Sequence, residues 1–295
     1  MQATATNVRV KFQHILFPTD FSASSEAAMP YAEAIARHYG ATIYPAHVVP
    51  PEPYHGLPME PFPVTLDYAW RNAEENLAMI ATSERLKDIP HQILLKQGPL
   101  WDVLSGMTQK YSADLIVVGT HGRTGLSKVA MGSVAEEIYR RASCPVLCVG
   151  PRVPHDELHT PEFRRILFAT DFSHASLAAL TYALSFAEET EAQLTLLHLI
   201  PLAPLDEQQS LKTRSLDRLA ALMPSDASVW CKPDFEVRFE FPTEGIVAAA
   251  KRHHSDLIVM GVERSAHPRA VSHLPWAIAS EVIAQAICPV LTVRG

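Results

Sequence analysis

The fold of this chain is decided by one stretch, Asp114-Leu-Ile-Val-Val-Gly119-Thr-His-Gly122-Arg-Thr-Gly-Leu-Ser-Lys-Val-Ala-Met-Gly132-Ser133-Val134. Its apolar beginning is typical of a buried parallel strand, and the residues from Val134 onward are typical of a helix. Glycine lets a backbone approach a ligand closely, and the N–H groups and dipole of a helix start attract negative charge. The stretch therefore predicts a strand, an anion site and a helix. A glycine-rich turn with Ser133 as an ordinary N-cap fits the same residues.

Strands and helices alternate around this stretch. We expect strands over 14–17, 42–48, 91–95, 114–118 and 146–149, and helices over 22–39, 65–86, 100–110 and 134–142. Pro30 lies inside the first expected helix, which should therefore start late or be kinked, and Gly40 should end it. Alternating β and α elements predict a parallel sheet covered by helices on both faces.

The same plan occurs twice. Ile15-Leu-Phe-Pro-Thr-Asp20 returns as Ile166-Leu-Phe-Ala-Thr-Asp171, and Cys144-Pro-Val-Leu returns as Cys288-Pro-Val-Leu. In the second copy we expect strands over 166–168, 194–199, 235–241, 257–260 and 290–293, and helices over 176–188, 206–222, 245–254 and 275–286. The repeat predicts an α/β chain of two tandem open parallel-sheet, Rossmann-like domains over 1–150 and 162–295, joined by a proline-containing linker over 151–161.

The spacing Gly119-x2-Gly122-x9-Gly132-Ser133 resembles the nucleotide-binding signature of the universal stress protein family, in its ATP-binding branch. Pro18-Thr19-Asp20 resembles the end of that family's first strand, His47-Val48 the end of its second, and Cys144-Pro145 the start of its last. The resemblance implies an adenine nucleotide alpha hydrolase-like fold that binds ATP or a related adenine nucleotide, with or without Mg²⁺. It also implies that the last strands of the two copies pair as a pseudo-dimer, which is expected to form a homodimer.

Ten residues are candidates for holding the nucleotide: Pro18, Thr19, Asp20, Val48, Gly119, Gly122, Arg123, Gly132, Ser133 and Val134. Ligands bind beyond the carboxyl ends of parallel strands, where these residues converge. Asp20 can accept from ribose hydroxyls or cap the following helix, and the residues favour neither role. In the family, the backbone at the position of Val48 reads the adenine edge. Arg123 can neutralise phosphates or belong to a solvated loop face.

The second copy departs from this pattern. When the copies are aligned on Cys144 and Cys288, Trp276-Ala277 stands where the first copy has Gly132-Ser133. Arg264 replaces Gly122, Ala169 replaces Pro18, and Glu263 adds negative charge. A large ring at a helix start fills the space that a phosphate needs. We therefore expect the second copy to be a degenerate domain, and the chain to bind about one nucleotide.

Composition limits the class of protein. Of the 295 residues, 47% are hydrophobic and 19% charged, as in a globular protein, and the net charge of −7 argues against nucleic acid or an anionic membrane as partner. No apolar run reaches bilayer length, and the first residues have no signal-peptide core, so a cytoplasmic location is expected. The 4 cysteines and 14 histidines show no metal-ligand spacing, and no metal site is expected.

These observations predict a tandem stress-response protein that acts as a nucleotide-dependent regulator. Whether it is an enzyme stays open, because no catalytic set can be placed from spacing. One alternative is a slow ATPase or a metal-dependent small-molecule hydrolase that uses the histidines of the second copy. Another is a structural, chaperone-like stress protein that binds no nucleotide.

Overall fold

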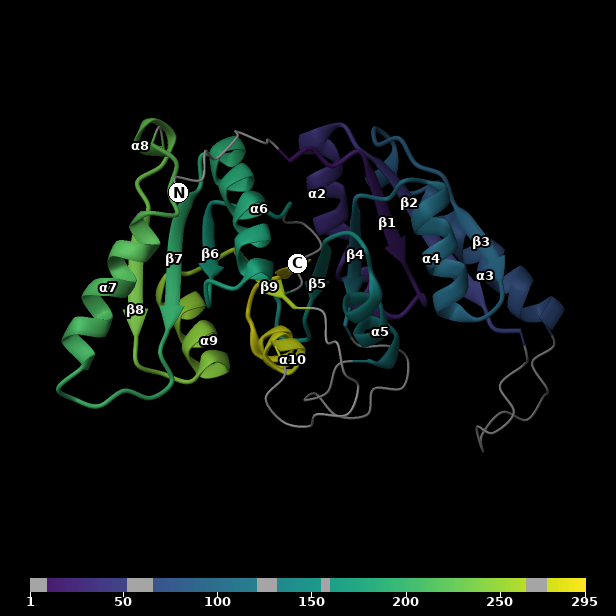
Figure 1. Cartoon of the computed structure of the whole chain (residues 1–295). Coiled ribbons are helices and arrows are strands. Elements are labelled where there is room, and N and C mark those ends of the chain that lie inside the picture. Colours follow the sequence, from purple (N-terminus) through teal and green to yellow (C-terminus); the bar gives the residue numbers. More distant parts are fainter. Residues whose placement is uncertain (1–9, 52–65, 121–131, 155–159, 226, 264–274) are drawn as a thin grey trace.

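A computed structural model of the chain describes residues 10–51, 66–120, 132–154, 160–225, 227–263 and 275–295 (Figure 1). Within these residues a single ten-stranded sheet has the order β3-β2-β1-β4-β5-β10-β9-β6-β7-β8. The first copy supplies β1 (His14–Pro18), β2 (Thr42–Val49), β3 (Leu94–Gln97), β4 (Leu115–Gly119) and β5 (Val146–Val149). The second supplies β6 (Arg165–Ala169), β7 (Gln193–Leu199), β8 (Asp234–Arg238), β9 (Leu257–Val262) and β10 (Val290–Arg294).

Helices connect the parallel strands of each copy. Those of the first copy are α1 (Ala23–Glu26), α2 (Met29–Tyr39), α3 (Leu66–Ala81), the 3₁₀ turn η1 (Glu84–Leu86), α4 (Leu100–Lys110) and α5 (Ser133–Arg141). Those of the second are α6 (His174–Thr190), α7 (Gln208–Ala220), α8 (Ala227–Trp230), α9 (Pro242–Arg252) and α10 (Pro275–Gln285). The predicted α/β class with two tandem Rossmann-like units is confirmed, whereas the domain limits over 1–150, 151–161 and 162–295 stay a prediction.

The first expected helix is interrupted, as Pro30 predicts. Ser22 caps α1 by accepting from the Ser25 N–H group, and Pro30 lies in the first turn of α2, where its missing N–H costs nothing. Gly40 ends α2 with a φ of 68°, a left-handed conformation that favours glycine. Local signals therefore set both ends of this segment.

Two hydrophobic cores lie on the two faces of the sheet. In β1, Ile15 and Phe17 join the core that contains α2 and α6, whereas Leu16 joins the core that contains α4, α5, α9 and α10. All three side chains are no more than 1% exposed. Side chains alternate along a strand, so continuous apolar runs such as Leu115–Val118 fill both cores at once. The prediction of helices on both faces is confirmed.

The two copies join edge to edge. β5 and β10 pair antiparallel, with Leu147 opposite Leu291 and Cys148 opposite Val290. The Thr292 hydroxyl also donates to the Val146 carbonyl over 3.1 Å. This pairing closes what would otherwise be two exposed apolar edges. The predicted pseudo-dimer of the two copies within one chain is therefore confirmed.

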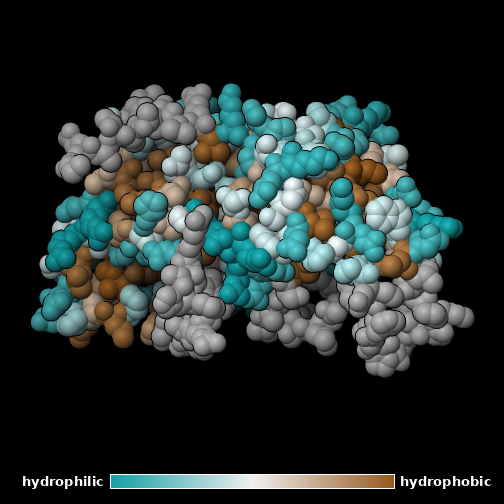
Figure 2. Space-filling model, turned by 45° about the vertical axis from the view of Figure 1, so that its right-hand side comes forward, coloured by the Kyte–Doolittle hydropathy of each residue, from teal (hydrophilic) through white to brown (hydrophobic). Residues whose placement is uncertain are grey.

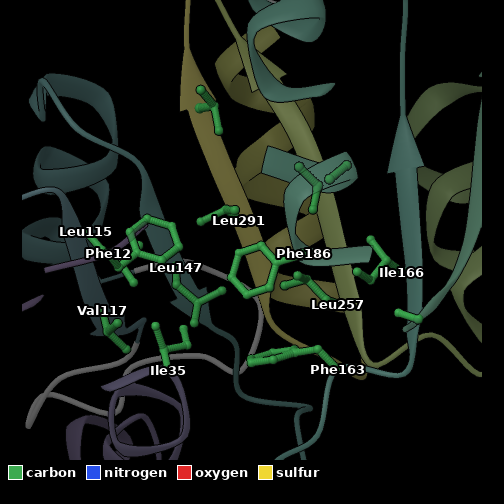
Figure 3. Close-up of a cluster of buried hydrophobic side chains, with 14 of the residues drawn as sticks. Phe12, Ile35, Leu115, Val117, Leu147, Phe163, Ile166, Phe186, Leu257 and Leu291 are labelled. Atoms are coloured by element: carbon green, nitrogen blue, oxygen red, sulfur yellow. The ribbon is translucent and has the colours of Figure 1, made fainter. Parts of the chain in front are cut away.

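Aromatic side chains reinforce this junction (Figure 3). Phe186 of α6 lies against Phe12 of the first copy with ring centroids 5.8 Å apart, against Tyr39 at 6.1 Å and against Phe163 at 5.4 Å. We call these four residues the junction cluster. The Val10 N–H group also donates to the Ser185 hydroxyl over 2.9 Å. The segment before β1 thus packs on a helix of the other copy.

Some element ends differ from the prediction. β8 ends at Arg238 and not at 241, because Phe241 is the N-cap of α9 and Pro242 occupies its first turn. α3 ends at Ala81, after which η1 forms, and β3 begins at Leu94 and not at 91. The short α8 was not predicted. Apolar periodicity detects an element better than its limits, which depend on capping.

Candidate functional site

The candidate residues of the first strands lie at one edge of the sheet. The order β2-β1-β4 places the reversal of strand order between β1 and β4. Thr19 follows β1, and its N–H group donates to the Ala46 carbonyl of β2 over 2.9 Å. The Thr19 carbonyl in turn lies 2.7 Å from Nδ1 of His47. Pro18, Thr19 and Asp20 are thereby fixed beside the end of β2. Their contact there, Ala46, lies two residues before Val48 on that strand.

The turn after β1 is held by its own side chains. The Thr19 hydroxyl accepts from the Phe21 N–H group over 3.0 Å, and Asp20 Oδ1 accepts from the Ser22 N–H group over 3.0 Å. These bonds support Phe21 in a left-handed conformation, with a φ of 61°, which is strained for a residue with a side chain. The Phe21 ring stacks on His47 with centroids 4.6 Å apart. Asp20 thus has a structural role in the turn.

The second copy repeats this turn. Asp171 Oδ1 accepts from the Ser173 N–H group over 2.9 Å, and Phe172 has a φ of 62°. Burial raises the pKa of Asp171, but hydrogen bonds from Ser173 outweigh burial and hold the pKa below its ordinary value. Since both copies build the same network, an aspartate at this place does not by itself indicate a nucleotide.

Gly119 also has a structural reason to be glycine. A Cβ atom there would lie 2.0 Å from the Ser24 carbonyl oxygen, because the end of β4 touches the backbone of α1. Gly261 in the second copy approaches the backbone of Ala175 in the same way, at 2.2 Å from its carbonyl carbon. The first glycine of the motif therefore serves helix packing in both copies.

The start of α5 is the part of the site that distinguishes the first copy. The Gly132 N–H group donates to the Thr120 carbonyl over 2.7 Å, which ties the helix start to the end of β4. Gly132 has φ −62° and ψ 142°, a conformation open to any residue, so its backbone angles do not require glycine. Val134 is 43% exposed. The first turn of this nine-residue helix thus lies beside the end of β4, and the first N–H groups of a helix have no partner within the helix.

Three candidates cannot be placed in full. Gly122 and Arg123 lie outside the described residues, and so does the side chain of Ser133. The structure therefore brings together Pro18, Thr19, Asp20, Gly119 and Gly132 at adjoining strand ends, with Val48 on the next strand.

Thr120 is a residue of the site that the sequence did not single out. It is 1% exposed, and both its N–H group and its hydroxyl donate to the Val149 carbonyl, over 3.1 and 3.3 Å. The repeat offered a signal, because the equivalent residue after Gly261 is Val262, which has no hydroxyl. Thr120 links the start of α5 to β5.

The edge of the second copy carries an arginine that sequence reasoning also missed. The Arg218 guanidinium lies 3.8 Å from the ring centroid of Phe172, whose other neighbour is His198 at 4.5 Å. Burial lowers the pKa of His198, and the nearby Arg218 lowers it further. The Arg218 side chain thus covers the Phe172 ring from α7. The Trp276 side chain, expected to fill the phosphate position, lies outside the described residues.

The histidines of the second copy do not gather around a metal within the part of the chain that the structure describes, where no group of three or more metal-binding side chains occurs. His253 instead lies 2.7 Å from Glu236, which also accepts from Arg238 over 2.6 Å and Arg252 over 2.8 Å. These four residues form an ion-pair cluster between β8 and α9.

Glu236 predicts a dependence of stability on pH. Burial raises the pKa of this carboxyl, but hydrogen bonds from His253, Arg238 and Arg252 hold it at about 2, below the ordinary 4.5. The ionised form of Glu236 is thus favoured in the folded state. Its contribution to the free energy of unfolding is therefore present above pH 4.5 and is lost as pH falls toward 2. We expect Glu236→Gln to cost at most about 3 kcal/mol at neutral pH, reduced by solvent screening of its exposed partners.

Urea denaturation of both proteins at neutral pH and at about pH 3 measures this difference, which should shrink at the lower pH. The control is Glu244→Gln on the exposed part of α9, which should change stability by no more than about 0.5 kcal/mol. A Glu236→Gln penalty that stays constant with pH would contradict the prediction.

Comparisons with known proteins find relatives of both copies. The model of the universal stress protein family matches the chain twice, over residues 11–150 and 162–294. A universal stress protein of Methanocaldococcus jannaschii is 34% identical over 140 residues, which are 47% of this chain and 82% of the relative. One of Mycolicibacterium smegmatis is 27% identical over 299 residues, covering 95% of this chain and 96% of the relative.

A solved structure agrees with the whole fold. A universal stress protein from Archaeoglobus fulgidus superposes with a TM-score of 0.71 at 20% identity, and covers 95% of this chain and 98% of its own. Both copies and their arrangement are thus found in another tandem chain. Among the described residues, no helix combines the length and apolar character needed to cross a bilayer.

Proposed function

The chain belongs to the universal stress protein family, and from this premise we propose that its first domain binds ATP or a related adenine nucleotide. The nucleotide, with or without Mg²⁺, acts as a regulatory ligand in a stress response. As part of the same proposal, the protein acts in the cytoplasm and its two-domain unit forms a homodimer. The second domain, with Trp276-Ala277 in the motif, takes no nucleotide.

One observation carries the proposal. The start of α5, with Gly132-Ser133, is tied to the end of β4 by the 2.7 Å bond from the Gly132 N–H group to the Thr120 carbonyl. This places a helix N-terminus at the point where strand order reverses between β1 and β4. Parallel α/β sheets bind ligands at such points, and helix N-termini favour phosphate. The proposed roles are phosphate binding by Gly122, Arg123, Gly132, Ser133 and Val134, and nucleoside contacts by Pro18, Thr19, Asp20, Val48 and Gly119.

An exchange of residues between the copies tests the proposal. We expect wild-type protein, stripped of nucleotide, to bind about one ATP per chain in isothermal titration calorimetry. The double variant Gly132→Trp with Ser133→Ala copies the second domain and should lose this binding, because the indole fills the phosphate position. Circular dichroism checks that the variant is folded.

The matched control for this exchange is Glu137→Gln, on the same helix, whose carboxylate pairs with Arg141 at the surface. It should bind ATP as the wild type does. Two equivalent sites per chain would disprove the asymmetry between the domains. A folded wild-type protein that binds no adenine nucleotide would favour the structural, chaperone-like alternative.

A further inference from the structure

α5, which begins at the proposed phosphate site, reaches the second domain at its other end. Tyr139 near its end is 1% exposed. Its hydroxyl lies within hydrogen-bonding reach of the Ser280 side chain on α10. Tyr139 shares a continuous core with Ala279, Val282 and Ile283 of α10, all 0% exposed. In Figure 1 the two helices lie below β5, one from each domain.

The backbone beside this pair is in direct contact across the junction. Gly150 follows β5, and a Cβ atom there would lie 2.1 Å from the Ile283 carbonyl oxygen. The end of β5 therefore touches the backbone of α10 with no room for a side chain. We call Tyr139, Gly150, Ser280 and Ile283 the α5–α10 contact.

Hydrogen bonds connect this contact to the proposed nucleotide site. The Gly132 N–H group donates to the Thr120 carbonyl, and the Thr120 N–H group and hydroxyl donate to the Val149 carbonyl, next to Gly150. At the other end of α5, Arg294 of β10 donates to the Ala142 carbonyl over 3.4 Å. Both ends of the helix are thus attached to the junction between the domains.

From this arrangement we propose that the second domain positions and regulates the nucleotide site of the first domain through the α5–α10 contact. The proposal rests on the proposed function. A ligand bound at the start of α5 restricts the position of the whole helix. It thereby also restricts how Tyr139 packs against α10. Coupling between two sites is reciprocal, so nucleotide stabilises the contact and the contact raises nucleotide affinity. The second domain thereby has a role although its own motif is degenerate.

Two conservative variants test the contact. Tyr139→Phe keeps the ring and removes only the hydroxyl, and Ser280→Ala removes its partner. We expect each to weaken MgATP binding by about five- to tenfold in calorimetry, although neither residue lies at the ligand. The matched control is Thr243→Val, which removes a 2.8 Å hydrogen bond to Glu281, the next residue on α10, toward α9. The affinity of this control variant for MgATP should stay within about twofold of the wild-type value.

Hydrogen–deuterium exchange of the wild-type protein gives a second, independent readout. MgATP should slow amide exchange in α10 as well as in α5, but not in α9. A purely structural contact would leave α10 unchanged by the ligand. If the wild type binds MgATP while α10 exchange and the affinities of both variants stay unchanged, the inference is wrong and the proposed function stands. If the wild type binds no nucleotide, both fall.

Discussion

Replacement of Gly119 by alanine destabilises the folded chain by roughly 3 kcal/mol or more, because the added atom has no space. Its Cβ would lie 2.0 Å from the Ser24 carbonyl oxygen and 2.6 Å from the Ser24 carbonyl carbon. Both are backbone atoms at the start of α1, so no side-chain rotation can relieve the overlap. β4 and α1 must separate, and the turn that carries Asp20 must move with them. Thermal and urea denaturation measure the loss.

The matched control for this prediction is Gly106→Ala in α4. A Cβ atom at Gly106 meets nothing within 4 Å. Alanine should therefore stabilise this exposed helix position, by about 0.4–1 kcal/mol. Equal stabilities of the Gly119→Ala and Gly106→Ala proteins would show that β4 and α1 can separate freely, and would contradict the packing role assigned to Gly119.

Truncation of Phe186 to alanine is expected to cost about 3–5 kcal/mol and to uncouple the two domains. The ring is 2% exposed and touches Phe12 and Tyr39 of the first domain as well as Phe163 of the second. Its removal leaves a cavity within the junction cluster, where each domain loses packing against the other. Calorimetric unfolding should then resolve separate transitions, because cooperativity between domains depends on their shared interface.

The control is Leu177→Ala on the same helix, whose side chain is 41% exposed and should change stability by no more than about 0.5 kcal/mol. Figure 2 shows that apolar side chains also reach the surface of the molecule, so loss of a hydrophobic residue is not costly by itself. A Phe186→Ala protein that unfolds in one transition with nearly unchanged stability would show that the β5–β10 pairing alone holds the domains together.

Much of the fold could be predicted because local patterns carry it. The apolar run at Leu115–Val118 indicates a strand buried on both faces, and Pro30 indicates the interrupted helix. The repeated Cys-Pro-Val-Leu indicates the last strand of each copy, and these strands pair as expected. Element limits were predicted less well, as at β8, where a proline starts α9 earlier than strand propensity suggests.

That several candidate residues lie at one edge of the sheet could be predicted, but the role of each residue could not. A motif spacing cannot separate a glycine that a ligand requires from one that packing requires. Gly119 and Gly261 both approach helix backbones, and Asp20 and Asp171 both hold the turn after a strand. The difference between the copies rests on Gly132-Ser133 against Trp276-Ala277 and on Thr120 against Val262.

The sequence by itself determined the strands, the repeat and the sheet edge at which the candidate residues gather, since each follows from periodicity or chain order. Only the tertiary structure decided which residues touch across the copies. Phe12 packs on Phe186, and Tyr139 meets Ser280. Such pairs are far apart in the chain, and no local propensity encodes them. They arise when two sheets join at β5 and β10 and bring helices of both domains within contact distance.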